Sequence, residues 1–112
     1  MPLKSVFTIG EASTETGLSK KAIRLYEQVG LIRKPARGLN GYRYYDKGTL
    51  LELKKIATLR GFGLSIAECR EAIQIDCCRD VLERKRCQLR SEVRALEAKI
   101  IQITNELSEQ AG

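Results

Sequence analysis

The chain has 112 residues, of which 43% are apolar and 30% are charged, and its formal net charge is +6 at pH 7. This length allows one compact domain with a projecting element and excludes two independent cores. No apolar run reaches the about 20 residues that span a bilayer, and Met1–Gly10 does not resemble a signal peptide. We therefore expect a cytoplasmic protein with no membrane partner.

Positive charge is concentrated in the first part of the sequence. Residues 1–70 contain 13 Lys and Arg against 6 Asp and Glu, a net charge of +7, whereas residues 71–112 contain 7 against 8, a net charge of −1. A basic segment beside a near-neutral one is typical of a protein that binds a polyanion with one part. The sequence has no histidine, which excludes Ser/His/Asp and Cys/His catalysis and mixed Cys/His zinc fingers, so we expect no enzyme.

Two short helices are predicted near the N-terminus. Thr8, followed three residues later by Glu11, predicts a capping box, and a glycine ends this first helix, at about residues 9–16. Ser19 caps a second helix, which Gly30 ends. The short connection between them indicates a helix-turn-helix. The core residues expected here are Val6, Ile9, Ala12, Ile23, Leu25 and Leu31.

A basic hairpin is predicted next. Residues 31–45 contain a loop rich in Pro, Gly and Asn, and the aromatic stretch Tyr42–Tyr45 follows it. Aromatic residues beside a glycine-rich turn favour a small β-hairpin, with Arg37 near its tip and Arg43 on the returning strand. Next to a helix-turn-helix, such a hairpin is a wing.

Two further helices follow the wing. Asp46 caps a third helix, in which apolar residues recur with a period near 3.6 until Gly61. Ser65 and Glu68 form a second capping box and begin a fourth helix, which we expect to end near Asp76. The residues expected to face inward are Leu50, Leu51, Leu53, Ile56, Ala57 and Leu59, then Ile66, Ala67, Cys69, Ala72 and Ile73.

The last segment, residues 81–110, has a heptad repeat that only Arg86 interrupts. Its apolar residues are Leu82, Leu89, Val93, Leu96, Ile100, Ile103 and Leu107. A helix of about 30 residues is about 45 Å long, which is too long to lie on so small a domain. We therefore expect a homodimer in which two such helices pair, and a helix folded back on the basic domain is the alternative.

The second helix and the wing carry the residues that we expect to contact DNA, because this helix of a helix-turn-helix enters the major groove. These residues are Ser19, Lys20, Lys21, Arg24, Tyr26, Arg37, Arg43 and Tyr44. Tyr26 either offers its hydroxyl to a phosphate or is a partly buried aromatic residue. Lys54, Lys55 and Arg60 of the third helix are weaker candidates, since charge on a helix face is usually solvated.

Four separated motifs can be compared with known families. They are Phe7–Ala12, Ala22–Glu27 with Gly30–Leu31, Asn40–Tyr45, and Leu59–Ser65. Their order and spacing resemble the MerR family of transcriptional regulators, closely over residues 6–75 and in general form over the long helix. The predicted fold is thus mainly α with a small β-hairpin wing: a winged helix-turn-helix at residues 1–75, a junction at residues 76–80, and a dimerisation helix at residues 81–110.

The resemblance also implies how such a protein acts. It implies a homodimer whose long helices form an antiparallel coiled coil, bound to a pseudo-palindromic site on double-stranded DNA. In this family the regulator distorts promoter DNA so that RNA polymerase can use it, which implies RNA polymerase as a partner. By motif position, Arg24, Tyr26 and Arg43 are the family-like DNA contacts.

Four cysteines in a chain without a secretory signal are expected to be reduced thiols. Cys69 occupies an apolar helix position and is expected in the core. The resemblance implies that metal-sensing relatives carry a cysteine just before the long helix, where this chain has Cys77 and Cys78. With Cys87, these thiols are candidate ligands for a thiophilic metal or metalloid ion, best shared between two chains. The alternative is that they are small apolar residues packed at a helix junction.

The sequence therefore predicts a sequence-specific transcriptional regulator that such an ion switches and that needs no cofactor to fold. An effector-free repressor or architectural protein of the same fold is one alternative. A thiol-based metal carrier or redox protein is another, and the absence of a C-x-x-C motif and of strand–helix alternation argues against it.

Overall fold

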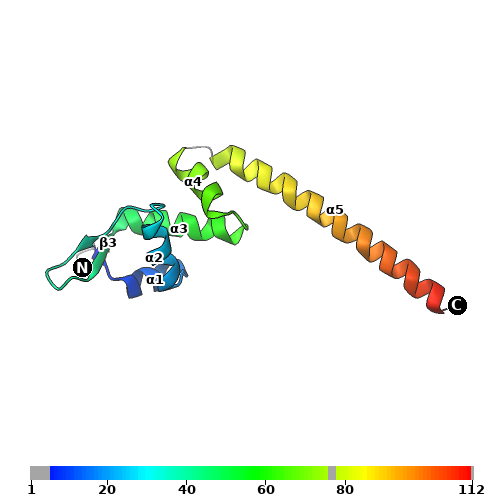
Figure 1. The fold of residues 1–112 in the computed structure, drawn as a ribbon, viewed down its shortest axis with the longest axis horizontal. Coiled ribbons are helices and arrows are strands. Elements are labelled where there is room, and N and C mark those ends of the chain that lie inside the picture. Colours follow the sequence, from blue (N-terminus) through cyan, green and yellow to red (C-terminus); the bar gives the residue numbers. More distant parts are fainter. Residues whose placement is uncertain (1–5, 76–77, 112) are drawn as a thin grey trace, which may run out of the picture. The chain divides into compact units, whose positions relative to one another are not determined.

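The computed structural model describes residues 6–75 and 78–111. Its elements are β1 (Val6–Phe7), α1 (Ile9–Thr16), α2 (Lys20–Gln28), β2 (Ala36–Arg37), β3 (Arg43–Asp46), α3 (Lys47–Gly61), α4 (Ile66–Gln74) and α5 (Cys78–Ala111) (Figure 1). The chain divides into two compact units, residues 1–70 and 71–112. This division falls where the basic part of the sequence gives way to the near-neutral part.

The helix-turn-helix consists of α1 and α2, and its caps are those predicted. Thr8 Oγ1 accepts a hydrogen bond from the backbone N–H of Glu11 at 3.2 Å, and Glu11 Oε1 accepts one from the N–H of Thr8 at 3.0 Å. Gly17 ends α1 in the left-handed region, with φ of 76°. Ser19 Oγ accepts from the N–H of Ala22 at 3.0 Å and starts α2. The turn between the helices is therefore set by local chemistry.

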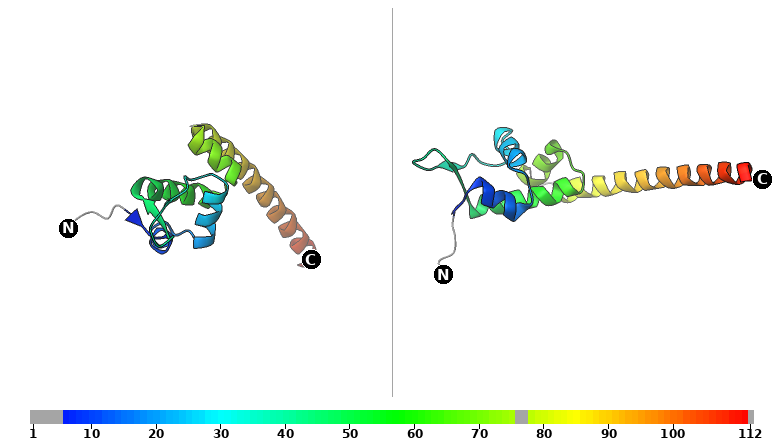
Figure 2. Two further views of the ribbon diagram at one scale, coloured as in Figure 1. Left: turned by 60° about the vertical axis from the view of Figure 1, so that its left-hand side comes forward. Right: turned by 90° about the horizontal axis from the view of Figure 1, so that it is seen from below.

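The small sheet has three antiparallel strands in the order β1-β3-β2. Ala36 pairs with Tyr44 and Arg37 pairs with Arg43, which confirms the predicted hairpin. Seen from below, the hairpin loop extends beyond α1 and α2 (Figure 2). The pairing of β1 with β3 was not predicted, because a strand of two residues is too short to show an alternating pattern.

The core of the first unit lies between α1, α3 and β3. Its buried residues are Ala12, Ile23, Tyr26, Leu31, Ile32, Tyr45, Leu50, Leu53, Ile56, Leu59, Leu64 and Cys69. In α3 the buried leucine and isoleucine positions follow one another at steps of three, so the buried stripe shifts by about 60° around the helix at each step. Asp46 begins this helix as predicted, since its Oδ1 accepts from the N–H of Thr49 at 2.7 Å.

Four residues expected in the core are exposed. Val6, Leu25 and Leu51 lie on the surface, and so does Ala67. Leu25 and Leu51 each adjoin a buried neighbour, and adjacent helical residues point about 100° apart, so both cannot face the core. Those predictions were wrong because apolar character alone does not select one residue of an adjacent pair.

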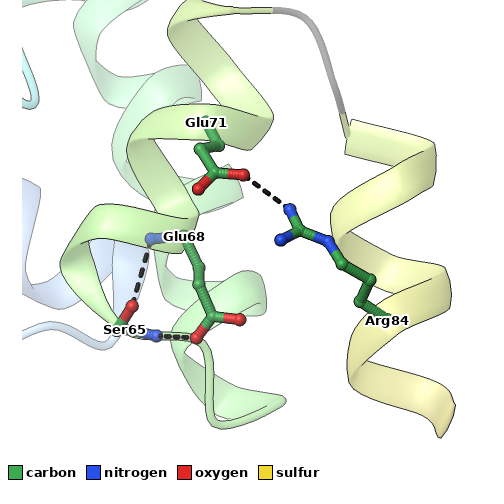
Figure 3. A network of polar contacts seen from close by, with 4 residues as sticks. All are labelled: Ser65, Glu68, Glu71 and Arg84. Carbon is green, nitrogen blue, oxygen red and sulfur yellow. Dashed lines mark hydrogen bonds and ion pairs between the residues drawn. The ribbon is translucent and has the colours of Figure 1, made fainter.

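Figure 3 shows two sets of polar contacts, one at the start of α4 and one within the second unit. Ser65 and Glu68 form the predicted capping box, with N···O distances of 3.0 and 3.1 Å. Within the second unit, Arg84 Nη2 donates to Glu71 Oε2 at 2.6 Å. The helix α4 ends at Gln74, and the expected end at Asp76 lies outside the described residues.

The helix α5 is longer than predicted, with 34 residues from Cys78 to Ala111. It is one continuous helix (Figure 2). Because it begins at Cys78, the part of the expected junction from Cys78 to Asp80 is helical. Val81 near its start is fully buried, although the heptad repeat did not include it. Within the described ranges, no helix is long and apolar enough to cross a membrane.

Candidate nucleic-acid interface

The first turn of α2 presents basic side chains to solvent. Lys20, Lys21 and Arg24 are exposed and follow the Ser19 cap directly. A helix N-terminus also carries unpaired backbone N–H groups and a partial positive charge, both of which favour anions. Tyr26 is the predicted contact that the structure buries, with 4% of its surface exposed. It is buried more deeply than the partly buried alternative expected.

The turn of the hairpin is held by its own polar groups. Arg37 Nη1 donates to the carbonyl of Gly41 at 3.0 Å, and Asn40 Nδ2 donates to the hydroxyl of Tyr44 at 3.3 Å. The side-chain oxygen of Asn40 accepts from the N–H of Tyr42 at 3.1 Å. Gly41 has a φ of 80°, which favours glycine. These contacts give the loop a defined shape.

Arg43 of β3 is paired with Glu27 of α2. The distance from Arg43 Nε to Glu27 Oε2 is 2.9 Å, and the two side chains are 31% and 11% exposed. The contact is an ion pair that lacks the alignment of a hydrogen bond. Sequence reasoning missed Glu27, because no local pattern links a residue of the second helix to one of the wing.

Tyr45 lies fully buried beside these charges. Burial raises the pKa of its phenol, Glu27 raises it further, and Arg43, Arg24 and Arg37 act in the opposite direction. All four charged groups therefore act on one hydroxyl. The Glu27–Arg43 pair is the place where α2 and the hairpin meet.

Two grooves flank this meeting point, and both are lined by Arg24 and Arg43. The larger, of about 640 Å³, is lined by Arg24, Glu27, Gln28, Lys34, Pro35, Arg37 and Arg43. The smaller, of about 330 Å³, is lined by Thr8, Ile9, Arg24, Gly41, Tyr42, Arg43 and Tyr44. The larger groove has four cationic side chains and one carboxylate, so its net positive charge favours the binding of phosphate groups. Lys34 was also missed, although its place beside Arg33 was visible in the sequence.

The helix α5 carries an apolar row on its surface. Leu89, Val93, Leu96, Ile100, Ile103 and Leu107 are 41% to 63% exposed, whereas Leu82 is half-buried. They recur at steps of four and three, so they share one side of the helix. Six large apolar side chains in a continuous row form a surface that a monomer in water does not favour.

The cysteines are separated by the structure. Cys69 is buried as predicted, and burial raises the pKa of its thiol, so it is a poor nucleophile or ligand. Cys78 is half-buried, in a shallow hollow with Leu82 and Arg86. Cys87 is exposed, about 13 Å further along α5 and about 180° around it. Cys77 lies outside the described residues.

One described chain therefore does not bring the candidate ligands together. Across residues 6–75 and 78–111, no three Cys, His, Asp or Glu side chains lie close enough to hold a metal ion. Cys78 and Cys87 face opposite sides of the same helix, so they cannot bind one ion within a chain.

Comparison with known proteins identifies relatives of this fold and sequence. Residues 7–75 match the family described as MerR HTH family regulatory protein. The HTH-type transcriptional regulator HmrR of Rhizobium leguminosarum bv. viciae is 48% identical over 67 residues, which are 60% of this chain and 51% of that protein. CueR of Salmonella typhi is 40% identical over 67 residues, 60% of this chain and 49% of that one. The chain thus spans about half the length of the curated relatives it matches.

Solved structures share the fold. The EcmrR–DNA complex in EcmrR-RPo has a TM-score of 0.78 and 26% identity, and the match covers 92% of this chain and 39% of that one. PbrR691 from Ralstonia metallidurans CH34, in complex with lead(II), has a TM-score of 0.67 and 25% identity over 86% of this chain and 84% of that one. The family match spans more than half of the chain and contains all four sequence motifs. The chain therefore belongs to the MerR family of regulatory proteins.

Proposed function

We propose that this chain is a transcriptional regulator that binds double-stranded DNA through residues 1–75. The observation that carries the proposal is the cluster of Arg24, Lys34, Arg37 and Arg43 in one groove between α2 and the hairpin. It adjoins the exposed lysines of the first turn of α2. The regulators HmrR and CueR and the DNA-bound EcmrR support the same function.

The arrangement explains how such a chain reads DNA. The N-terminus of α2 enters the major groove, where Ser19, Lys20, Lys21 and Arg24 reach base edges and phosphates. The hairpin follows the sugar-phosphate backbone of the DNA, where Arg37, Arg43 and Tyr44 contact phosphates. The family implies that the bound regulator distorts the promoter DNA so that RNA polymerase can use it.

We also propose that α5 pairs with α5 of a second chain. The exposed apolar row from Leu89 to Leu107 is the supporting observation, because pairing removes this surface from water. A dimer presents two helix-turn-helix units to two half-sites, which raises affinity and sets the half-site spacing.

A second candidate role is the sensing of a thiophilic ion. Its support is Cys78, next to Cys77 in sequence, and the structural likeness to PbrR691, which was solved with lead(II). Thiolates are the soft ligands that such ions prefer. Since one chain does not close a site with Cys87, a second chain has to complete the ligand set.

DNA binding is tested with Arg24→Ala and a matched control, Arg94→Ala, which removes the same charge from an exposed position on α5. Fluorescence anisotropy with a labelled duplex measures the dissociation constant across a salt series. We expect the wild-type affinity to fall steeply with salt, and Arg24→Ala to weaken binding about tenfold or more. Equal affinities for the two variants, or no binding by the wild type at low salt, would contradict the proposal.

A further inference from the structure

Glu27 is a carboxylate on the basic face of the first unit. It lines the same groove as Arg24, Lys34 and Arg37, and its side chain is only 11% exposed. By charge alone, a carboxylate at this place repels DNA phosphates and weakens binding. A DNA-binding groove is therefore an unfavourable place for Glu27 unless the carboxylate has another role.

The contact that Glu27 makes points to that role. Glu27 lies in the last turn of α2 and Arg43 is the first residue of β3, so their ion pair joins the helix to the hairpin. Elsewhere α2 packs mainly on α1, whereas β3 packs on α1, α3 and the other strands. The pair is thus a direct polar link between two elements that otherwise make few contacts with each other.

The chemistry of arginine allows the link and a DNA contact at once. A guanidinium has five N–H donors in a planar fork, and the contact with Glu27 is made at Nε. The donors of the two terminal nitrogens are not consumed by that contact. Arg43 is also still 31% exposed, so its outer edge is accessible.

The surroundings keep the pair in place before any ligand arrives. Glu27 is nearly buried, and a buried carboxylate is costly unless a cation lies beside it. The atoms that meet, Glu27 Oε2 and Arg43 Nε, are themselves buried although both side chains are partly exposed. A side chain whose rotamer is already fixed loses less entropy on binding.

We propose that Glu27 is a positioning residue for DNA binding: its carboxylate holds the Arg43 guanidinium, and with it the hairpin, against α2. This inference rests on the proposed DNA-binding function. Simple electrostatics predicts that removal of the negative charge of Glu27 strengthens binding to DNA. The positioning role predicts the opposite, that its removal weakens binding.

The experiment compares Glu27→Gln with Glu15→Gln, which makes the same charge change at an exposed position on α1. The probe is a mixed-sequence DNA duplex of about three helical turns, and anisotropy gives the dissociation constant over a salt series. We expect Glu15→Gln to bind as tightly as the wild type or more tightly. We expect Glu27→Gln to bind about tenfold more weakly, with a salt slope smaller by about 1 because one phosphate contact is lost.

A second measurement needs no DNA and distinguishes a released Arg43 side chain from a general loss of stability in the variant. The ¹H–¹⁵N signal of Arg43 Nε–H, assigned by its disappearance in Arg43→Lys, reports whether the guanidinium is held. We expect a rigid Nε–H, with a high ¹H–¹⁵N heteronuclear NOE, in the wild type and in Glu15→Gln, and a mobile one, with a low NOE, in Glu27→Gln, below the melting transition of each protein. In an Arg43→Ala background, Glu27→Gln should no longer weaken DNA binding.

The outcomes separate the two proposals. Glu27→Gln binding as tightly as Glu15→Gln, with an unchanged salt slope, overturns the positioning role and leaves DNA binding intact. So does a rigid Arg43 Nε–H, with a high heteronuclear NOE, in Glu27→Gln. No binding by the wild type at low salt overturns DNA binding and the positioning role together, whereas the expected results in both measurements support the positioning role.

Discussion

At the residue scale, Gly38 in the hairpin has a specific steric reason to be glycine. A Cβ built there lies 2.5 Å from Cε2 of Tyr44 and 3.1 Å from Oδ1 of Asn40. The first distance is far below a normal contact, and the ring belongs to a residue paired in β3. The packing of the Tyr44 ring over the turn therefore requires a residue without a side chain.

We expect Gly38→Ala to displace Tyr44 and to lower the free energy of unfolding by about 1–2 kcal/mol. Urea denaturation followed by circular dichroism measures this loss. Gly61→Ala is the control, because a Cβ at Gly61 meets nothing within 4 Å and alanine is favoured at a helical position. A Gly38→Ala protein as stable as Gly61→Ala would show that the ring moves without cost.

Asp46 links the stability of α3 to pH. Hydrogen bonds from the backbone N–H and the hydroxyl of Thr49 lower the pKa of its carboxyl below the ordinary value of 3.8. Because the folded-state pKa is the lower one, the stabilisation is present above the unfolded-state pKa and is lost as pH falls through the folded-state pKa.

Asp46→Ala should therefore lower the free energy of unfolding by about 1 kcal/mol near neutral pH. The difference from the wild type should shrink as pH falls below 3.8, the ordinary pKa of the group. Urea titrations at a series of pH values measure it. Asp46→Asn keeps a capping side chain without titrating, so its stability should stay closer to the wild type. A pH-independent difference for Asp46→Ala would contradict the assignment.

At the element scale, the turns and caps of the first unit are set by neighbouring residues. Thr8, Ser19, Asp46 and Ser65 each accept a hydrogen bond from a residue three positions later, and each begins a helix where the sequence predicted one. Such signals are local, so they are readable without the fold. The boundary of α5 was predicted less well, since the helix begins at Cys78, inside the segment that the sequence predicted as a junction.

The continuity of α5 has a consequence for ion binding. Because Cys78 and Cys87 face opposite sides of one helix, one chain cannot hold an ion between them. We expect Cys78→Ser to abolish uptake of lead(II) by the reduced protein, and Cys87→Ser to reveal whether Cys87 of a second chain completes the ligand set. Thiolate-to-metal absorption during a titration with lead(II) measures both. Cys69→Ser is not a suitable control, because that thiol is buried in the core. Uptake retained by Cys78→Ser would contradict a site at Cys78.

At the scale of the whole molecule, the second unit carries an apolar surface that a folded monomer leaves in water. The row from Leu89 to Leu107 lies on one side of α5. A second copy of the same helix is the partner that matches both its length and its heptad spacing.

We expect Leu96→Glu to shift the protein from dimer to monomer, because a carboxylate in the seam has to be desolvated on pairing. Gln102→Glu introduces the same group about 140° around the helix from the centre of the row and should leave the dimer intact. Sedimentation equilibrium over a range of concentrations distinguishes the two. A wild-type protein that sediments as a monomer at all concentrations would refute the pairing.

The sequence by itself determined the helix caps, the glycine turns, the heptad spacing and the family, because each of these depends on residues close together in the chain. Only the tertiary structure decided which of two adjacent apolar residues is buried, as with Leu25 and Tyr26. It also decided that β1 joins the hairpin and that Glu27 pairs with Arg43. These contacts join distant segments, and no local pattern records which distant side chain will share a buried site.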